Sequence, residues 1–332
     1  MIGTAGFSVP AFATKLSDKR AEAAAAQAKL DDLRSKAEVA SEAYNEARDK
    51  YVALSAEVRD TRSKISDLKA EQATLQEALG NRADEMYRSD GALGVIEMLL
   101  SARNLEDFNS VIELLQRVSE QDAATVAKLK ATRTKLEIAE RTLAAQEADA
   151  LAQSQAMEAN AAQAKEQVAA AEQMLAGLKS DIRALIAEQQ AAAEAAAKAR
   201  YEASHPSSDS GGDPPSSSKG ALAVWWAMKA LGSPYRWGAS GPDRFDCSGL
   251  TMWAYGHAGI NLPHYSQAQY SSGPHVAKGN LEPGDLVFFG NPIHHVGMYV
   301  GGGDFIEAPY TGARVRITSL SGRSDYAGAT RP

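Results

Sequence analysis

The feature that most constrains the fold of this chain is a seven-residue hydrophobic repeat in its N-terminal half. From residue 30 to residue 79, apolar side chains recur at spacings that alternate between three and four residues. The positions of this ladder are Leu30, Leu33, Ala37, Ala40, Tyr44, Ala47, Tyr51, Leu54, Val58, Thr61, Ile65, Leu68, Gln72, Leu75 and Leu79. Only Thr61 and Gln72 among them are polar. A sustained 3.5-residue period is typical of a coiled coil.

Composition divides the chain into two dissimilar parts. No proline occurs between Pro10 and Pro206, whereas residues 220–332 contain all four tryptophans and most of the aromatic side chains. Such a split in a chain of 332 residues excludes a single average globular fold. It predicts long helices over residues 15–203 and a compact domain over residues 220–332.

The helical region is predicted to be an antiparallel hairpin, with a parallel homodimer as the alternative. Gly80 and Asn81 are expected to weaken the first helix, and residues 80–117 to form the tip, with Asn104 capping a new helix. The second arm, from about residue 118 to residue 203, is rich in alanine, which has the highest helix propensity. Apolar residues of the tip would bind a partner protein or pack against each other; they include Leu99, Leu100, Phe108 and Leu115.

Two short segments have compositions of their own. Residues 1–14 end in Ala11-Phe12-Ala13, an A-x-A pattern that fits the remnant of an export signal, with a disordered leader as the alternative. Residues 204–219 are rich in serine, glycine and proline and predict a flexible linker.

Charge and cysteine content exclude several kinds of function. The formal net charge is −7 and neither half is strongly basic, which argues against nucleic-acid binding. The sequence contains no run of 18 apolar residues, so we expect no transmembrane segment. The single cysteine, Cys247, excludes an internal disulfide framework and a cysteine-cluster zinc site. We expect no metal and no cofactor.

The C-terminal region is predicted to be an α+β domain. Helices are expected over residues 219–231 and from Cys247 onward, with Asp246 as the cap of the second. Alternating patterns then predict short strands at Asp285–Phe289, His294–Val300, Asp304–Ala308 and Arg314–Thr318.

A cysteine at the start of a helix has a chemical consequence. The free N–H groups and partial positive charge of the helix end stabilise a thiolate and can also hold an oxyanion. A base is still required, and the histidines offer several candidates. His294 and His295 begin a predicted strand and would face opposite sides of it. A lone Cys and His in sequence remain a weak indication of catalysis, and a buried, inert thiol is the alternative.

Four motifs in this region resemble the NlpC-type family of papain-like cysteine peptidases that cut bacterial cell-wall peptides. They are PYRWG (234–238), FDCSGL (245–250), LEPGDLVFF (281–289) and HVGMYVG (295–301). The resemblance implies a papain-like fold with Cys247 as nucleophile and His295 as base. The third residue of the family lies twelve positions after the histidine, which is Glu307 here. Its presence resembles the actinobacterial cell-division members, and a carboxylate would orient the imidazole.

The same resemblance assigns substrate contacts around the nucleophile. Tyr235 of PYRWG would lie in the oxyanion and substrate region, and Asp246 and Ser248 would line the cleft. Each of these residues also has a purely structural alternative, since tyrosine can pack against the helix and both Asp246 and Ser248 can cap it. His264 and His294 are interpreted as surface or structural residues.

The helical half resembles the coiled-coil domains of secreted cell-wall hydrolases and hydrolase activators recruited by the divisome transporter FtsEX, most clearly over residues 86–118. The combined resemblance implies a secreted peptidoglycan endopeptidase acting in daughter-cell separation. Its cleavage site would be the D-γ-glutamyl–meso-diaminopimelate bond, its partner the extracellular part of FtsX, and its coiled coil would recruit or restrain the enzyme. The alternatives are a non-enzymatic scaffold or activator that only binds wall peptides, and an amidase or acyltransferase on the same fold.

Overall fold

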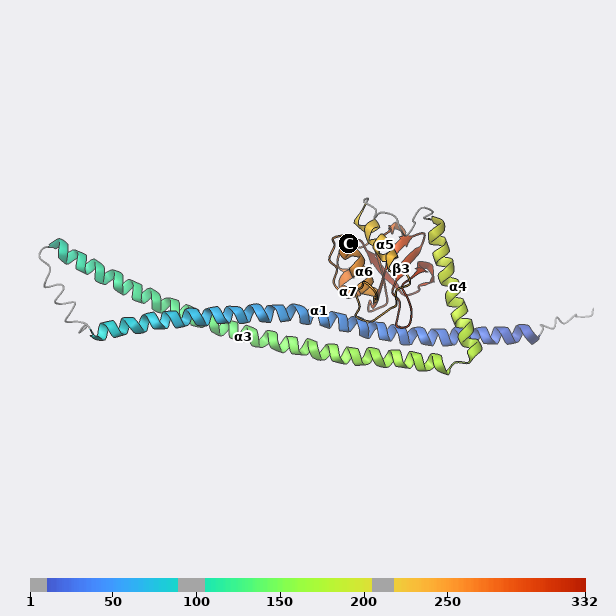
Figure 1. Ribbon diagram of the computed structural model, residues 1–332, viewed down its shortest axis with the longest axis horizontal. Helices are drawn as coiled ribbons and strands as arrows, with labels where there is room; N and C mark the ends of the chain where they lie inside the picture. The colour runs from blue at the N-terminus through green and yellow to red at the C-terminus, as the bar shows by residue number, and fades with distance from the viewer. Residues whose placement is uncertain (1–10, 89–104, 205–217) are drawn as a thin grey trace, which may run out of the picture. The chain divides into compact units, whose positions relative to one another are not determined.

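A computed structural model describes residues 11–88, 105–204 and 218–332 (Figure 1). The chain divides into two compact units. One consists of residues 50–152, and the other joins the segment before residue 50 to residues 153–332. No helix among the described residues combines the length and the hydropathy needed to cross a bilayer.

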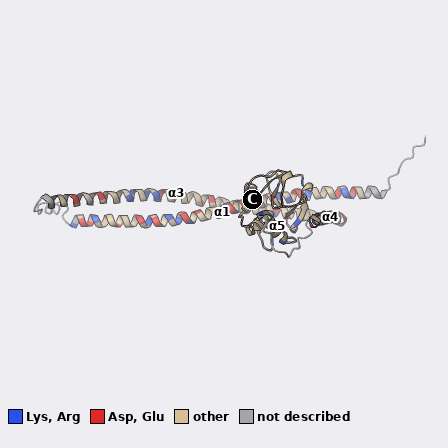
Figure 2. Cartoon of the chain, turned by 90° about the horizontal axis from the view of Figure 1, so that it is seen from above, with Lys and Arg blue, Asp and Glu red and all other residues tan. Residues whose placement is uncertain are grey.

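The first unit is a pair of antiparallel helix segments. They belong to α1 (Ala11–Arg88) and α3 (Leu105–Gly177). Ile65 and Leu68 of the predicted heptad ladder pack against Ala139 of the opposite helix. Ion pairs flank this seam, including Arg62 with Glu147 at 2.7 Å, and Figure 2 shows charges of both signs along each helix. The expected antiparallel arrangement is therefore present within a single chain.

The ends of these helices differ from the sequence-based expectation. The first helix continues through Gly80 and Asn81 to Arg88, because a single helical glycine costs only about 1 kcal/mol relative to alanine and neighbouring packing offsets it. The second helix begins at Leu105. The structure does not describe the residues that were predicted to bind a partner at the tip. These are Leu99 and Leu100, together with the side chains of Phe108 and Leu115.

The second arm is not one continuous helix. It ends at Gly177, and a separate helix, α4 (Ser180–Ser204), follows it at a steep angle (Figure 1). The first turns of α4 bury Ile182 and Ile186 against Leu30 of α1. Its last turns bury Ala197 and Tyr201 in the core of the C-terminal domain. The sequence indicated helix here but not its division, because Leu175, Leu178, Ile182 and Leu185 keep a heptad spacing across the break.

The C-terminal domain, residues 218–332, is an α+β fold as predicted. Its helices are α5 (Lys219–Lys229), α6 (Cys247–His257) and the short α7 (Ser266–Tyr270), with single 3₁₀ turns at Lys278–Asn280 and Leu320–Gly322. The strands are β1 (Leu286–Phe289), β2 (His295–Gly301), β3 (Asp304–Glu307), β4 (Arg316–Ser319) and β5 (Tyr326–Thr330). They form one antiparallel sheet in the order β4-β3-β2-β1-β5.

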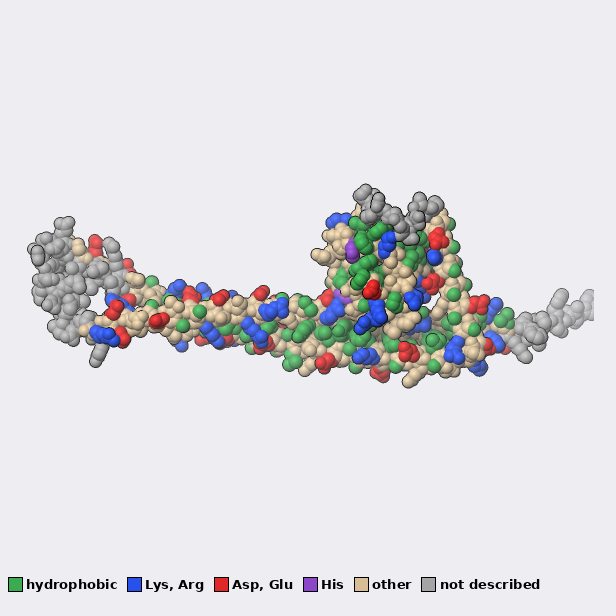
Figure 3. All heavy atoms as spheres, in the orientation of Figure 1, with side chains coloured by type: hydrophobic (Ala, Val, Ile, Leu, Met, Phe, Trp, Pro, Cys, Tyr) green, Lys and Arg blue, Asp and Glu red, His purple; other side chains and the backbone are tan. Residues whose placement is uncertain are grey.

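Four of these strands match the predicted segments within two residues. The fifth, β5, was missed because its sequence, YAGAT, contains a glycine at φ 151° and only one large apolar side chain. On the face of the domain visible in Figure 3, basic, acidic and hydrophobic side chains are interspersed without a continuous basic surface.

The core of this domain fixes where α6 meets the sheet. Leu250, Ala254 and Tyr255 of α6 are fully buried with Val296 and Met298 of β2. The Tyr255 hydroxyl donates to the Gly284 carbonyl at 2.7 Å, which ties the helix to the segment before β1. This packing joins α6, which begins at Cys247, to β2, which begins at His295.

Candidate functional site

Cys247 is the first residue of α6 and its side chain is buried, with 3% of its surface exposed. The preceding Asp246 is the N-cap, and one of its carboxylate oxygens accepts from the Gly249 N–H at 2.7 Å. Its other oxygen accepts from the Gly238 N–H at 2.8 Å. A side chain at position 249 would collide with the Ala239 carbonyl, so glycine is required for this close approach. The predicted helix start and its cap are both present.

His295 and Glu307 lie on adjacent strands, at the start of β2 and the end of β3. The His295 Nε2 and Glu307 Oε2 atoms are 2.8 Å apart, and both side chains are only 1% exposed. This bond uses Nε2 and leaves the Nδ1 atom of His295 without a hydrogen-bond partner among the described residues. Burial lowers the pKa of His295, although the carboxylate of Glu307 opposes that effect.

Two guanidinium groups hold Glu307 from its other side. Arg316 Nε donates to Glu307 Oε1 at 3.0 Å, and Arg323 Nη1 lies 3.5 Å from Oε2. Burial by itself raises the pKa of Glu307, but the bond to His295 and the charges of Arg316 and Arg323 outweigh it and bring that pKa down to about 2. Glu307 is therefore an anion at neutral pH.

We expect the ionised Glu307 to contribute to stability in a defined range of pH. Its pKa falls from an ordinary 4.5 to about 2 in the folded chain, and each unit is worth about 1.4 kcal/mol. A depressed carboxyl pKa stabilises the fold above the unfolded pKa of 4.5, and this contribution, about 3 kcal/mol, is lost as the pH falls toward 2. Denaturant unfolding at pH 5 and pH 2.5 measures how much free energy of unfolding is lost between the two. This loss should be smaller for Glu307→Gln than for the natural chain, and equal losses would contradict the prediction.

A third element enters the site from the N-terminal helix α1. The Glu42 carboxylate lies directly against the cysteine: Cys247 Sγ donates to Glu42 Oε1 at 3.6 Å, and Ser248 Oγ donates to the same oxygen at 2.8 Å. The other oxygen, Oε2, accepts from the backbone N–H of Ser266. Glu42 is 6% exposed, so this carboxyl group fills the space in front of the thiol.

One helical turn earlier, Glu38 faces the histidine. Its Oε2 atom lies 3.6 Å from the otherwise unpartnered Nδ1 of His295. Burial raises the pKa of Glu38 well above its usual range, and burial together with the nearby Asp246 raises the pKa of Glu42. Burial, followed by the charges of Glu42, Asp246 and Glu38, raises the pKa of the Cys247 thiol well above its usual value. With α1 in this position the cysteine is a neutral thiol.

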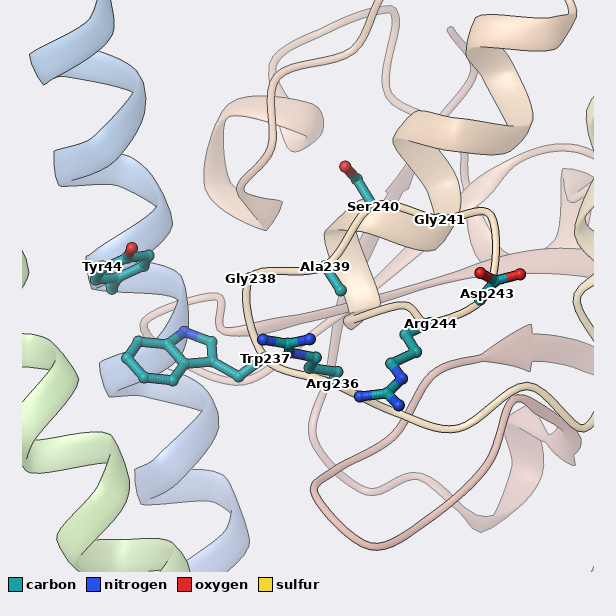
Figure 4. A pocket seen from close by; sticks show the side chains of 9 residues that line it. All are labelled: Tyr44, Arg236, Trp237, Gly238, Ala239, Ser240, Gly241, Asp243 and Arg244. Atoms are coloured by element: carbon teal, nitrogen blue, oxygen red, sulfur yellow. The ribbon is translucent and has the colours of Figure 1, made fainter.

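Further contacts fasten the same stretch of α1 to the domain. Asn45 donates to Asp246 Oδ2 at 3.1 Å, and Arg48 donates to the Gly238 carbonyl at 3.3 Å and to His264 Nδ1. Trp237 points from its loop toward α1 (Figure 4), where its ring meets Tyr44 edge-on at 4.7 Å. We refer to Glu38, Glu42, Asn45 and Arg48 together as the α1 latch.

The remaining predicted site residues also gather here. Tyr235 is 9% exposed, and burial and the nearby Cys247 raise the pKa of its hydroxyl. Asp246 and Ser248 flank the cysteine as expected and make the bonds described above. His264 is structural but not a surface residue, because it is 2% exposed and its Nε2 atom lies 2.8 Å from Asp246 Oδ1. His294 contacts Ser35 of α1 at 2.9 Å.

Several residues of the site were not identified from the sequence. They are Glu38, Glu42, Ser266, Arg316 and Arg323. No metal-binding cluster of three or more His, Cys, Asp or Glu side chains occurs in the parts of the chain that the structure describes.

Comparison with known proteins gives two family matches. Residues 232–328 match the NlpC/P60 family, and residues 65–139 match the coiled-coil domain of the peptidoglycan hydrolase PcsB. The first match contains Cys247, His295 and Glu307, and the second lies in the helical half.

Curated relatives are similar to part of the chain. A probable endopeptidase of Corynebacterium glutamicum is 49% identical over 94 residues, which are 28% of this chain and 45% of that protein. The peptidoglycan endopeptidase RipA of Mycolicibacterium smegmatis is 40% identical over 115 residues, covering 30% of this chain and 23% of RipA. The chain thus spans less than half the length of the curated relatives it matches.

Among solved structures, an NlpC/P60 family protein from Bacillus cereus is 35% identical, with a TM-score of 0.34, over 36% of this chain and 41% of that protein. The family matches, together with the sequence identities, agree with the resemblance found in the motifs. Residues 232–328 therefore form a domain of the NlpC/P60 family, joined in one chain to a coiled-coil domain of the PcsB type.

Proposed function

We propose that this chain is a cysteine peptidase that hydrolyses amide bonds in the stem peptides of peptidoglycan. The observation that carries the proposal is that His295 is bonded through Nε2 to the anionic Glu307 and has no hydrogen-bond partner at Nδ1 among the described residues. It begins β2, which packs against α6, the helix that begins at Cys247. A nucleophile, a base and a group that orients the base are the components of covalent acyl transfer. Relatives named endopeptidases support the same reaction class.

The mechanism follows from these positions. His295 Nδ1 accepts the proton of the Cys247 thiol, and the sulfur attacks the substrate carbonyl carbon. The resulting oxyanion is stabilised by the N–H groups at the start of α6 and by Tyr235. As the C–N bond breaks, the imidazolium gives its proton to the leaving amine, and a thioester remains. Water, activated by His295, then hydrolyses the thioester and regenerates the thiol.

The contacts of Glu42 support a particular class of substrate. A carboxylate is held beside the thiol by the Ser248 hydroxyl and the Ser266 N–H. A γ-linked glutamyl residue carries an unlinked α-carboxylate close to its scissile γ-amide and could place that group in the same position. We therefore propose the D-γ-glutamyl–meso-diaminopimelate bond as the site of cleavage.

The α1 latch implies that the enzyme is restrained in this conformation. Glu42 occupies the space in front of the thiol and Glu38 faces the atom that must accept its proton. The block is both steric and electrostatic, since carboxyl groups beside the sulfur oppose thiolate formation. Activity then requires the segment around residues 38–48 to leave the cleft.

The test uses the full chain with its latch weakened by Glu42→Ala and Arg48→Ala. This chain is incubated with a soluble disaccharide-tetrapeptide, and the products are identified by mass spectrometry. Cleavage between glutamate and diaminopimelate supports the proposal, and Cys247→Ala on the same background is the control. Binding without cleavage would favour a non-enzymatic scaffold, and cleavage elsewhere or acyl transfer would favour an amidase or acyltransferase.

We further propose that the protein acts outside the cytoplasm in daughter-cell separation, and that the hairpin tip binds the extracellular domain of FtsX. The match of residues 65–139 to the coiled coil of a peptidoglycan hydrolase supports a dedicated role for the hairpin. Binding at the tip would pull on α1, the same helix that enters the active site.

We expect aspartate at Leu99, Leu100, Phe108 and Leu115 to weaken binding to this domain at least tenfold, because charge in an apolar contact is strongly unfavourable. Calorimetry with the isolated FtsX domain measures the effect, and circular dichroism checks that the hairpin remains helical. Normal binding by the substituted chain would rule out the tip as the contact.

A further inference from the structure

The catalytic domain carries a cationic wall beside His295, formed by Arg316 and Arg323. A cavity of about 550 Å³ is lined there by His295, Tyr310, Arg316 and Arg323 of the domain, by Glu38 and other residues of α1, and by one side of α4. Because His295 gives its proton to the leaving amine, the residue that carries this amine must occupy the space beside the imidazole. In the proposed reaction, this cavity therefore lies on the leaving-group side of the scissile bond.

The position of Arg323 within the wall is fixed from several directions. Its Nε and Nη2 atoms donate to the two oxygens of Asp325, both at 2.9 Å, and its guanidinium lies 4.0 Å from the centre of the Phe289 ring. Its third nitrogen faces Glu307 at 3.5 Å. These contacts leave two of the five N–H donors of a guanidinium available for a ligand. The side chain is 26% exposed even with α1 in place.

With α1 docked on the domain, the carboxyl group of Glu38 already occupies part of the cavity beside His295. Glu38 lies 3.6 Å from His295 Nδ1, and the charge of Arg323 opposes the effect of burial on its pKa. Arg34 of α1 meanwhile covers the Tyr310 ring at 3.8 Å. Departure of α1 uncovers both the ring and the guanidinium.

The uncovered wall would attract an anion through its N–H donors and not through an excess of positive charge. Arg316 and Arg323 are balanced by Glu307 and Asp325. When His295 has taken the thiol proton, the positive charge of the imidazolium is matched by the negative charge of the thiolate and then of the oxyanion. An acidic group on the leaving residue would accept hydrogen bonds from the free N–H groups of Arg323.

We propose that Arg323 forms a carboxylate-binding subsite for the residue on the leaving side of the scissile bond, with Tyr310 as its apolar floor. The inference rests on the proposed peptidase function and adds a specificity determinant to it. Arg316, whose Nε is engaged by Glu307, borders the subsite and holds the catalytic carboxylate.

The experiment compares two peptides that differ only in the leaving residue. They are L-alanyl-γ-D-glutamyl-L-lysine with a free terminal carboxylate and the same peptide as the terminal carboxamide. In the full chain with Glu42→Ala and Arg48→Ala, kcat/KM should be about tenfold higher for the acid. Arg323→Gln should bring this ratio close to one, and Arg323→Lys should restore part of it. Arg244→Gln, an exposed arginine outside this cavity, is the matched control and should keep the full ratio.

The ratio of kcat/KM for the acid to kcat/KM for the carboxamide distinguishes a loss of substrate recognition from damage to the catalytic residues. A disturbed Glu307 would slow both peptides alike and leave the preference intact. An unchanged preference in Arg323→Gln, or equal cleavage of both peptides by the chain that retains Arg323, would overturn the subsite alone. Cleavage of neither peptide by any variant would overturn the proposed peptidase function and the subsite with it.

Discussion

Replacing Glu42 and Arg48 with alanine should raise the rate at which iodoacetamide alkylates Cys247 by about a hundredfold. The two side chains contribute bonds to Ser248, the Ser266 N–H, the Gly238 carbonyl and His264. At ~0.5–1.5 kcal/mol net for each hydrogen bond, the loss of these four bonds removes roughly 2–6 kcal/mol from the docking of α1. A hundredfold change corresponds to about 2.7 kcal/mol, which lies in that range. Removal of Glu42 also takes away a charge that raises the pKa of the thiol.

The chain makes this measurement specific, because Cys247 is its single cysteine. Asp32→Ala with Lys36→Ala is the matched control: it removes one acidic and one basic side chain from the same helix, where both are more than half exposed and pair with each other. That variant should react at the rate of the natural chain. Rapid alkylation of the natural chain would show that the α1 latch does not protect the site in solution.

Release of the latch need not separate α1 from the domain altogether. The adjacent helix α4 has its own attachment, in which Arg200 forms a two-bond ion pair with the buried Asp304 and Tyr201 enters the domain core. The domain would then stay tethered near the hairpin while its cleft is open. A fragment beginning at residue 220 loses this attachment, so a fragment beginning at residue 180 is the better comparison for an unrestrained enzyme.

The sequence predicted the parts of this molecule that depend on local chemistry. The heptad ladder identified the hairpin, and the motifs around Cys247 and His295 identified the domain and its fold. Glu307 was found by its spacing from His295 within the family pattern, and β3 places it beside the imidazole.

The contact between the α1 latch and the catalytic domain could not be predicted from the sequence, for a physical reason. Counted from Leu30 as position a, Glu38 and Asn45 fall at b, Glu42 at f and Arg48 at e. These positions point away from the a/d seam, and in an ordinary coiled coil they are polar because they face water. The same residue types serve here to contact a second domain. A helix face of charged and polar residues therefore has the same sequence pattern whether it is exposed to solvent or contacts another domain. Only the tertiary structure shows which of the two applies.

The roles of the three central residues predict a graded loss of activity. In the full chain with Glu42→Ala and Arg48→Ala, the further change Cys247→Ala should reduce cleavage by about 10⁵-fold or more. The covalent route is then lost, and only binding and oxyanion stabilisation remain. His295→Ala removes the proton carrier of both half-reactions and should cost about 10³–10⁴-fold. The Cys247→Ala protein should melt as the parent does, since the change removes one small side chain; wild-type activity in it would refute the peptidase assignment.

Glu307→Gln should be milder than His295→Ala, at about 10–100-fold, because an amide oxygen can still accept from His295 Nε2 and keep Nδ1 directed at the thiol. What it lacks is the negative charge that stabilises the imidazolium and that Arg316 and Arg323 hold in place. Initial rates on one muropeptide, with a melting curve for each variant, rank the three. Equal losses in Glu307→Gln and His295→Ala would mean that the carboxylate charge, and not its hydrogen bond alone, sustains the ion pair. The pH profile then identifies the cause, because a destabilised imidazolium lowers the pKa of His295 further and moves the acid limb of activity to lower pH.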